Sequence, residues 1–259
     1  MRLGLRAKTR VRLKKVARRL VGAESTPASQ SEPDPYGLTL QPGDPHYRAY
    51  VGPPADYDLI AGIQFSLLFA VGMRETHRVL DVGCGSLRGG RLLIPYLRPG
   101  NYFGQDPNQW LIDSGIREEI GQDLVRLKRP RFSTRADFRF EDFGETFDFV
   151  MAQSILSHTY FDLAIQALRG MEAVLAPRGL ILATFVTGPS IARKAAGWEY
   201  PGCVNFDAQD IAGAVEQSGL ASCRLDWPHP RQEWHALAKP GMHAEIEELA
   251  RRLRSPLSP

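Results

Sequence analysis

The stretch that most constrains the fold is HRVLDVGCGSLRGGR, which occupies residues 77–91. Its apolar residues within 79–82 predict a short parallel strand that is buried on both faces. Gly83 and Gly85 predict a tight turn after this strand, because glycine tolerates such a turn and leaves the backbone open to a ligand. A rough stripe of leucines then predicts a helix that ends before Pro99. The helix N-terminus after such a turn favours a carboxylate or a phosphate.

Two acidic residues accompany this strand–turn–helix unit. Asp81 lies at the end of the first strand, just before the first glycine, and a second strand over 101–105 ends in Asp106. If the two strands are neighbours in a sheet, Asp106 lies next to the glycine turn. A carboxylate in that place can accept hydrogen bonds from both hydroxyls of a ribose. The pattern therefore predicts a site for a nucleoside-containing cofactor.

The order VLDVGCG, followed about 20 residues later by YFGQD, resembles the class I S-adenosylmethionine-dependent methyltransferases. The resemblance covers roughly residues 56–240. It implies an α/β fold, in which a doubly wound sheet of seven mostly parallel strands has an antiparallel last strand and helices on both faces. The sixth and seventh strands are expected over 220–227 and 233–239. It also implies that the chain is a methyltransferase whose cofactor is S-adenosylmethionine.

In that family the glycine turn holds the methionine end of the cofactor, and the acid after the second strand holds the ribose. An acid and an apolar neighbour after the third strand flank the adenine, and here either Asp137 with Phe138 or Asp142 fits that description. The candidate cofactor-binding residues are Asp81, Gly83, Cys84, Gly85, Arg88, Asp106, Pro107, Asp137, Phe138, Gln153 and Ser154. Arg88 is a candidate for the cofactor carboxylate, since a cation in the first turn of a helix is otherwise mildly unfavourable.

Methyl transfer is an in-line displacement at a sulfonium methyl, so the protein mainly aligns the reactants and excludes water. A hydroxyl acceptor also needs a base, and histidine suits that role near neutral pH. His158 is the first candidate because it follows the fourth strand on the ligand side, and His229 is the second because prolines flank it in its loop. The alternatives are a capping histidine and a plain turn histidine. The irregular segment 188–204 is expected to form a lid or a substrate wall.

The acceptor is expected to be an oxygen, in preference to a nitrogen, of a small molecule or a glycan. The sequence lacks the N-P-P-Y type tetrapeptide with which family members methylate amino groups. Two other functions stay open. One is a catalytically silent member that binds the cofactor as a scaffold, and the other is an NAD(P)-binding oxidoreductase, whose turn would read G-x-G-x-x-G.

The basic charge is concentrated at one end of the chain. Residues 1–20 carry nine lysines and arginines and no acid, so the remaining 23 basic residues are outnumbered by 29 acidic ones. The interpretations of this end are a solvated tail, a surface anchor on anionic lipid, a mitochondrial-type presequence, and, less favoured, contact with nucleic acid. The expected divisions are a basic amphipathic tail over 1–23, a linker and wrapping segment over 24–55, a methyltransferase domain over 56–240, and a closing helix and tail over 241–259.

Three scattered cysteines favour a reducing compartment and argue against disulfides, and the six histidines show no metal-ligand spacing. No metal is therefore expected. No secretory or transmembrane segment is predicted, so the expected location is the cytoplasm, with the tail as a peripheral contact to the inner face of a membrane. Oligomeric state leaves no signal in the sequence.

Among local features, a helix over 59–71 is expected to be capped by Asp56 or Asp58. Trp110 is expected to lie in the core. A turn at 177–179 is expected to lead into the fifth strand.

Overall fold

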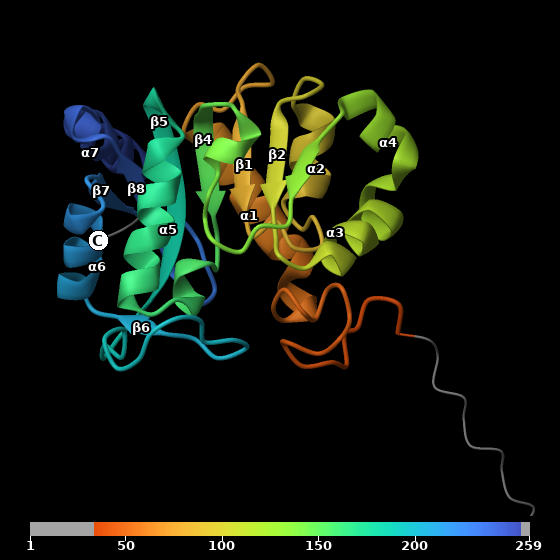
Figure 1. Cartoon of the computed structure of the whole chain (residues 1–259), viewed down its shortest axis with the longest axis horizontal. Helices are drawn as coiled ribbons and strands as arrows, with labels where there is room; N and C mark the ends of the chain where they lie inside the picture. The colour runs from red at the N-terminus through yellow and green to blue at the C-terminus, as the bar shows by residue number, and fades with distance from the viewer. Residues whose placement is uncertain (1–33, 255–259) are drawn as a thin grey trace, which may run out of the picture. The chain divides into compact units, whose positions relative to one another are not determined.

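The computed structural model describes residues 34–254. The predictions for the basic tail and for the first part of the linker lie outside the described residues. From residue 34 onward the chain forms one unit around a twisted sheet (Figure 1).

Seven strands follow the order β3-β2-β1-β4-β5-β8-β7, and a short eighth strand, β6, pairs with β5. The strands are β1 Val79–Val82, β2 Tyr102–Gln105, β3 Arg131–Ser133, β4 Phe147–Ala152, β5 Leu175–Thr187, β6 Asn205–Phe206, β7 Ala221–Leu225 and β8 Glu233–Ala238. The first five strands are mutually parallel, and β8 runs antiparallel to both β5 and β7. This is the predicted architecture, with β7 and β8 as its sixth and seventh strands and β6 as an addition.

The direction of the strand order changes between β1 and β4, because the chain moves from β1 outward to β3 and then returns to β4 on the other side. In open α/β sheets, ligands bind outside the carboxyl ends of the strands at such a switch point. The sheet therefore places the candidate site at the carboxyl ends of β1, β2 and β4.

Helices cover both faces of the sheet. They are α1 Tyr57–Ala70, α2 Gly90–Tyr96, α3 Gln109–Gly115, α4 Gly121–Lys128, α5 Phe161–Ala173, α6 Ala208–Gln217 and α7 His243–Leu253. One apolar core lies under α5 and α6, and a second lies under α1, α2, α3 and α7. Both faces are thus buried, which agrees with the fully buried residues of β1 and β2.

Two irregular segments lie at the carboxyl ends of the strands. The segment 34–56, which precedes α1, and the segment 188–204, which joins β5 to β6, both lie below the sheet in Figure 1, at the end toward which β1 and β4 point. We call them the covering segments. The first corresponds to the predicted wrapping segment.

Three local predictions are wrong. Asp56 occupies the N-cap position of α1, but neither its side chain nor that of Asp58 makes a capping hydrogen bond, because Asp56 is ion-paired with Arg231 and Asp58 with Arg91. Trp110 is 40% exposed and packs against a covering segment instead of the core.

The turn predicted at 177–179 is part of β5, where the pairing register with β4 shifts. Within residues 34–254, no helix has the length and apolar content needed to cross a bilayer.

Candidate active site

The glycine turn and the two acids meet at one edge of the sheet. Parallel pairing of β1 with β2 puts Asp81 opposite Gly104, so the ends of both strands lie side by side. One carboxylate oxygen of Asp106 accepts a hydrogen bond from the Gly85 N–H at 3.0 Å, and the other accepts from the Asn108 N–H at 2.8 Å. Asp106 therefore borders the turn, as the spacing of the two motifs predicts.

Burial changes the ionisation of both acids. Asp81 is 6% exposed and accepts a hydrogen bond from the Tyr102 hydroxyl at 2.7 Å. Its burial raises the pKa of Asp81 to about 6. Burial also raises the pKa of Asp106, although hydrogen bonds from Asn108 and Gly85 oppose this effect.

The two glycine positions of the turn have no room for a side chain. Gly83 and Gly85 have φ of 67° and 51°, a conformation that favours glycine. A Cβ at Gly83 would lie 2.0 Å from Ile155 Cδ1, and one at Gly85 would lie 2.7 Å from Val51 Cγ1. The two apolar side chains that cover the turn must therefore move aside when a ligand contacts the turn backbone.

Arg88 supplies a buried positive charge beside the turn. Its guanidinium donates to the Val51 carbonyl at 2.7 Å and to the Gln153 side-chain oxygen, and its Nε is buried without a hydrogen-bond partner. Burial lowers the pKa of Arg88 to about 10. Among residues 34–254, no carboxylate forms an ion pair with it. An anionic ligand group would compensate this buried cation, since an uncompensated buried charge is unfavourable.

Neutral polar side chains gather at the carboxyl end of β4. Gln153 accepts a hydrogen bond from Gln64 of α1 at 2.7 Å, and Ser154 accepts one from Gln232 at 2.7 Å. Gln64 and Gln232 thus contact two candidate site residues, although the sequence patterns did not single out either glutamine. A signal existed for Gln64, because it is a glutamine in the middle of an otherwise apolar helix.

The two candidate bases are held in opposite tautomers. Nδ1 of His158 lies 2.7 Å from the Gly202 carbonyl and 3.1 Å from the Glu199 carbonyl, so it must carry the proton. The lone pair of neutral His158 is then on Nε2. Nδ1 of His229 instead accepts from the backbone N–H groups of Arg231 at 3.1 Å and Gln232 at 2.9 Å, so Nε2 of His229 carries the proton.

The electrostatic surroundings of His229 keep it neutral. Its burial, together with Arg231 and Arg88, lowers the pKa of His229 to about 4. At neutral pH it is therefore a hydrogen-bond donor through Nε2, which lies 3.1 Å from the side-chain nitrogen of Gln153. Two nitrogens that both carry hydrogens do not satisfy each other, so this pair is suited to an acceptor atom of a ligand.

Comparison with known proteins agrees with this geometry. Residues 80–181 match the family model described as a methyltransferase domain. The chain carries a methyltransferase domain. The predicted fold is thereby confirmed, and the match agrees with the predicted methyltransferase family.

Solved structures share the fold at low sequence identity. Magnesium protoporphyrin IX methyltransferase from Synechocystis PCC 6803, with bound SAH, is 14% identical with a TM-score of 0.54, over 72% of this chain and 84% of that chain. A putative O-methyltransferase from Nostoc punctiforme PCC 73102 is 16% identical with a TM-score of 0.52, over 71% and 60% of the two chains. An S-adenosylmethionine-dependent methyltransferase from Clostridium acetobutylicum ATCC 824 is 10% identical with a TM-score of 0.52, over 71% and 92%.

The residues predicted to surround the adenine, Asp137, Phe138 and Asp142, do not gather into one site in this methyltransferase domain. Asp137 and Asp142 are both ion-paired with Arg135, and their side chains are 44% and 46% exposed. The hydrogen bond from Arg135 lowers the pKa of Asp137. Phe138 is 5% exposed and lies in the core under α5.

Two further predicted positions flank the turn. Cys84 is buried, and its sulfur packs so closely against Gly104 that a Cβ added there would lie 2.8 Å from it. Pro107 follows Asp106 and is exposed. The structure thus brings together the predicted residues at the ends of β1, β2 and β4, whereas Asp137 is held by Arg135 and Phe138 belongs to the core.

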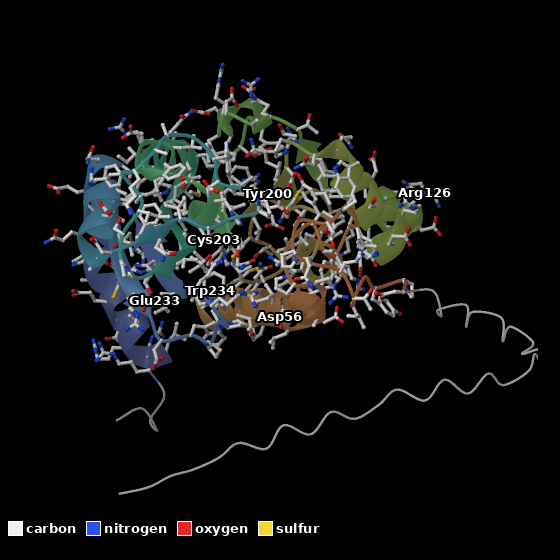
Figure 2. The ribbon with its side chains drawn as sticks, turned by 90° about the horizontal axis from the view of Figure 1, so that it is seen from below. Asp56, Arg126, Tyr200, Cys203, Glu233 and Trp234 are labelled. Atoms are coloured by element: carbon white, nitrogen blue, oxygen red, sulfur yellow. The ribbon has the colours of Figure 1, made fainter. Side chains whose placement is uncertain are left out.

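Aromatic side chains from both covering segments meet over the methyltransferase domain. The Tyr200 hydroxyl donates to the Tyr50 carbonyl, and the ring of Tyr50 lies 5.1 Å from the rings of both Tyr200 and Trp110. The Tyr200 ring also lies 5.2 Å from that of His158. Figure 2, which looks at this end of the sheet, shows Tyr200 on the viewed face, with Cys203 and Trp234 nearby. The covering segments therefore enclose the polar side chains at the strand ends.

Proposed function

We propose that the protein transfers a methyl group from S-adenosylmethionine to an oxygen atom of a small-molecule or glycan acceptor. The observation that carries the proposal is that Asp106 and the buried Arg88 both border the glycine turn, while no carboxylate of residues 34–254 is ion-paired with Arg88. An adenosyl amino acid needs these two features, an acceptor for a ribose and a cation for a carboxylate. The similarly folded magnesium protoporphyrin IX methyltransferase has been solved with bound SAH and with bound SAM, which supports the same cofactor here.

Each end of the cofactor has a matching group in the chain. Asp106 would accept hydrogen bonds from the ribose hydroxyls, and Arg88, which now donates to the Val51 carbonyl, would donate to the methionine carboxylate instead. The glycine turn lets the backbone approach the ligand closely. S-adenosylmethionine supplies a methyl group on a positively charged sulfur. The chain's own task is to align the acceptor with that methyl group and to exclude water, which the covering segments do.

His158 is the proposed base. Its Nδ1–H is held by the Gly202 carbonyl, which leaves the Nε2 lone pair free for the hydroxyl proton of the acceptor. Bound S-adenosylmethionine would supply the electrophilic methyl group and leave as a neutral thioether, and Nε2 of His158 would take the hydroxyl proton of the acceptor. His229, whose Nε2 carries a proton, is proposed to orient the acceptor by donating a hydrogen bond.

An oxygen acceptor is supported by the fold shared with a putative O-methyltransferase and by the lack of the N-P-P-Y type tetrapeptide. The acceptor class is tested by incubating the pure protein with S-adenosylmethionine and a metabolite extract, and by searching for a gain of one methyl group by mass spectrometry. A methylated alcohol, phenol or sugar is the expected product. A methylated amine alone would refute the oxygen assignment.

The two alternatives are tested separately. Calorimetric titration with S-adenosylhomocysteine and with NAD is expected to show binding of the first only, and binding of NAD alone would favour the oxidoreductase. Binding of S-adenosylhomocysteine without transfer to any fraction of the extract would favour the silent scaffold.

A further inference from the structure

A cavity of about 370 Å³ lies on the hairpin of β7 and β8, at the same end of the sheet as the candidate active site. Its wall includes Trp227, His229 and Gln232. The hairpin reaches this end because β8 begins at Glu233, which pairs with Phe185 near the carboxyl end of β5. Figure 2, which looks at this end of the sheet, shows Glu233 and Trp234 close together. The volume falls within the range of small-molecule sites, about 300–1,000 Å³.

Two side chains of the cavity wall also border the proposed reaction centre. Gln232 donates to the Ser154 hydroxyl at 2.7 Å, and it lies 3.5 Å from the hydroxyl of Ser157, the residue before the proposed base. His229 lies 3.1 Å from the side chain of Gln153. A molecule in the cavity therefore contacts the same residues that line the carboxyl end of β4.

The wall offers neutral hydrogen-bonding groups. The side-chain oxygen of Gln232 is buried without a hydrogen-bond partner. His229 has its proton on Nε2, and its neutral state is favoured by the lowered pKa. Unmatched buried groups of this kind are unfavourable, and the oxygen of Gln232 would gain a partner if the side chain turned toward a ligand in the cavity. A ligand that both donates and accepts hydrogen bonds would satisfy both residues.

The rest of the wall does not favour an anionic ligand. Arg224 is ion-paired with Glu233 at 2.9 Å, so these two charges compensate each other. The indole N–H of Trp227 donates to the Ile63 carbonyl at 3.2 Å, which leaves the carbon surface of its half-buried ring for an apolar contact. The wall also includes the carboxylate of Asp226, which accepts hydrogen bonds. It thus combines an aromatic surface with neutral hydrogen-bonding groups and one further acid.

We infer that this cavity binds the acceptor as a sugar unit, a neutral ring rich in hydroxyl groups, and so presents one hydroxyl to the reaction centre. A sugar ring has a carbon–hydrogen face for the indole and several hydroxyls that both donate and accept, which matches Trp227, His229 and Gln232 together. A phenol has only one hydroxyl and would leave some of these hydrogen-bonding side chains without a partner. A carboxylate is disfavoured because it would face the unpartnered oxygen of Gln232, and two acceptors repel each other. The inference rests on the proposed function, because it names the acceptor class for that site.

The test uses the full-length protein saturated with S-adenosylhomocysteine and the methyl glycosides of glucose, galactose, mannose and rhamnose as probes. Saturation-transfer NMR is expected to show binding of at least one glycoside, and with S-adenosylmethionine that glycoside is expected to gain a methyl ether. Gln232→Leu is expected to weaken glycoside binding about tenfold, the effect of one lost hydrogen bond. Gln217→Leu, at an exposed position of α6, is the matched control and is expected to leave it unchanged.

Calorimetry with S-adenosylhomocysteine shows whether Gln232→Leu is folded and separates the two proposals. If S-adenosylhomocysteine binds but none of the glycosides does, or if Gln232→Leu binds the glycoside as well as the wild type does, the cavity assignment is overturned and the proposed function stands. Methylation of catechol or benzoate in place of the glycosides would also overturn it. If S-adenosylhomocysteine itself does not bind, the proposed function fails.

Discussion

Replacing Asp106 with Asn removes the negative charge from a side chain that is 7% exposed and that borders the glycine turn. Each hydrogen bond from a ribose hydroxyl to a charged acceptor contributes about 1.5–3 kcal/mol. Two such bonds amount to about 3–6 kcal/mol, or a factor of about 10²–10⁴ in affinity. Asn keeps one oxygen, so we expect the lower end of this range, a loss of about 100-fold for S-adenosylhomocysteine in calorimetric titration.

The control for this variant is Asp113→Asn, which makes the same change at an exposed position of α3. We expect it to bind S-adenosylhomocysteine as the wild type does. Because burial raises the pKa of Asp106, wild-type affinity should also fall as the pH drops through that pKa, and Asp106→Asn should lack this dependence. An affinity within threefold of wild type for a folded Asp106→Asn protein would refute the assignment of Asp106 to the ribose.

Three further predictions concern stability, catalysis and the basic tail. The pKa of Asp81 rises from 3.8 to about 6 on folding. Protonation of Asp81 therefore stabilises the fold by about 3 kcal/mol below pH 3.8, and this stabilisation is lost as the pH rises through 6. Asp81→Asn should therefore raise the melting temperature more at pH 8 than at pH 5, and an equal shift at both would contradict this. His158→Gln should lower turnover about 100-fold or more with little change in S-adenosylhomocysteine affinity. His229→Gln keeps a hydrogen-bond donor and should mainly raise the KM of the acceptor. If His229→Gln instead lowered turnover and His158→Gln raised the KM, the two roles would be exchanged. Deletion of residues 1–22 should abolish sedimentation with anionic vesicles, to which each basic residue contributes about 1 kcal/mol, and unchanged sedimentation would contradict the membrane contact.

The part of the site that could be predicted from sequence is the part made by local patterns. The strand, the glycine turn and the acid at the end of the next strand are specified by residues close together in the chain. Parallel pairing of β1 with β2 then brings Asp81 and Asp106 to one edge, as expected for strands joined by a helix. The wrapping segment was also predictable from its composition, although its contact with the turn through Val51 was not.

Long-range partners account for the failures. Asp56 and Asp58 have the residue type and position of helix caps, but arginines distant in sequence, Arg231 and Arg91, pair with them instead. Trp110 has the large apolar side chain typical of a core residue, yet its ring packs against that of Tyr50 in a covering segment. Gln64 was visible as a polar residue in an apolar helix, but its role depends on the packing of α1 against the end of β4.

The choice between the two histidines illustrates what a sequence pattern lacks. His158 and His229 both follow strands at the ligand end of the sheet, so their positions alone make them equivalent candidates. The direction of the neighbouring backbone distinguishes them, because carbonyl groups face Nδ1 of His158 and N–H groups face Nδ1 of His229. A carbonyl at Nδ1 leaves a lone pair on Nε2, and an N–H at Nδ1 leaves a proton there. The same side chain therefore favours proton removal at one position and hydrogen-bond donation at the other.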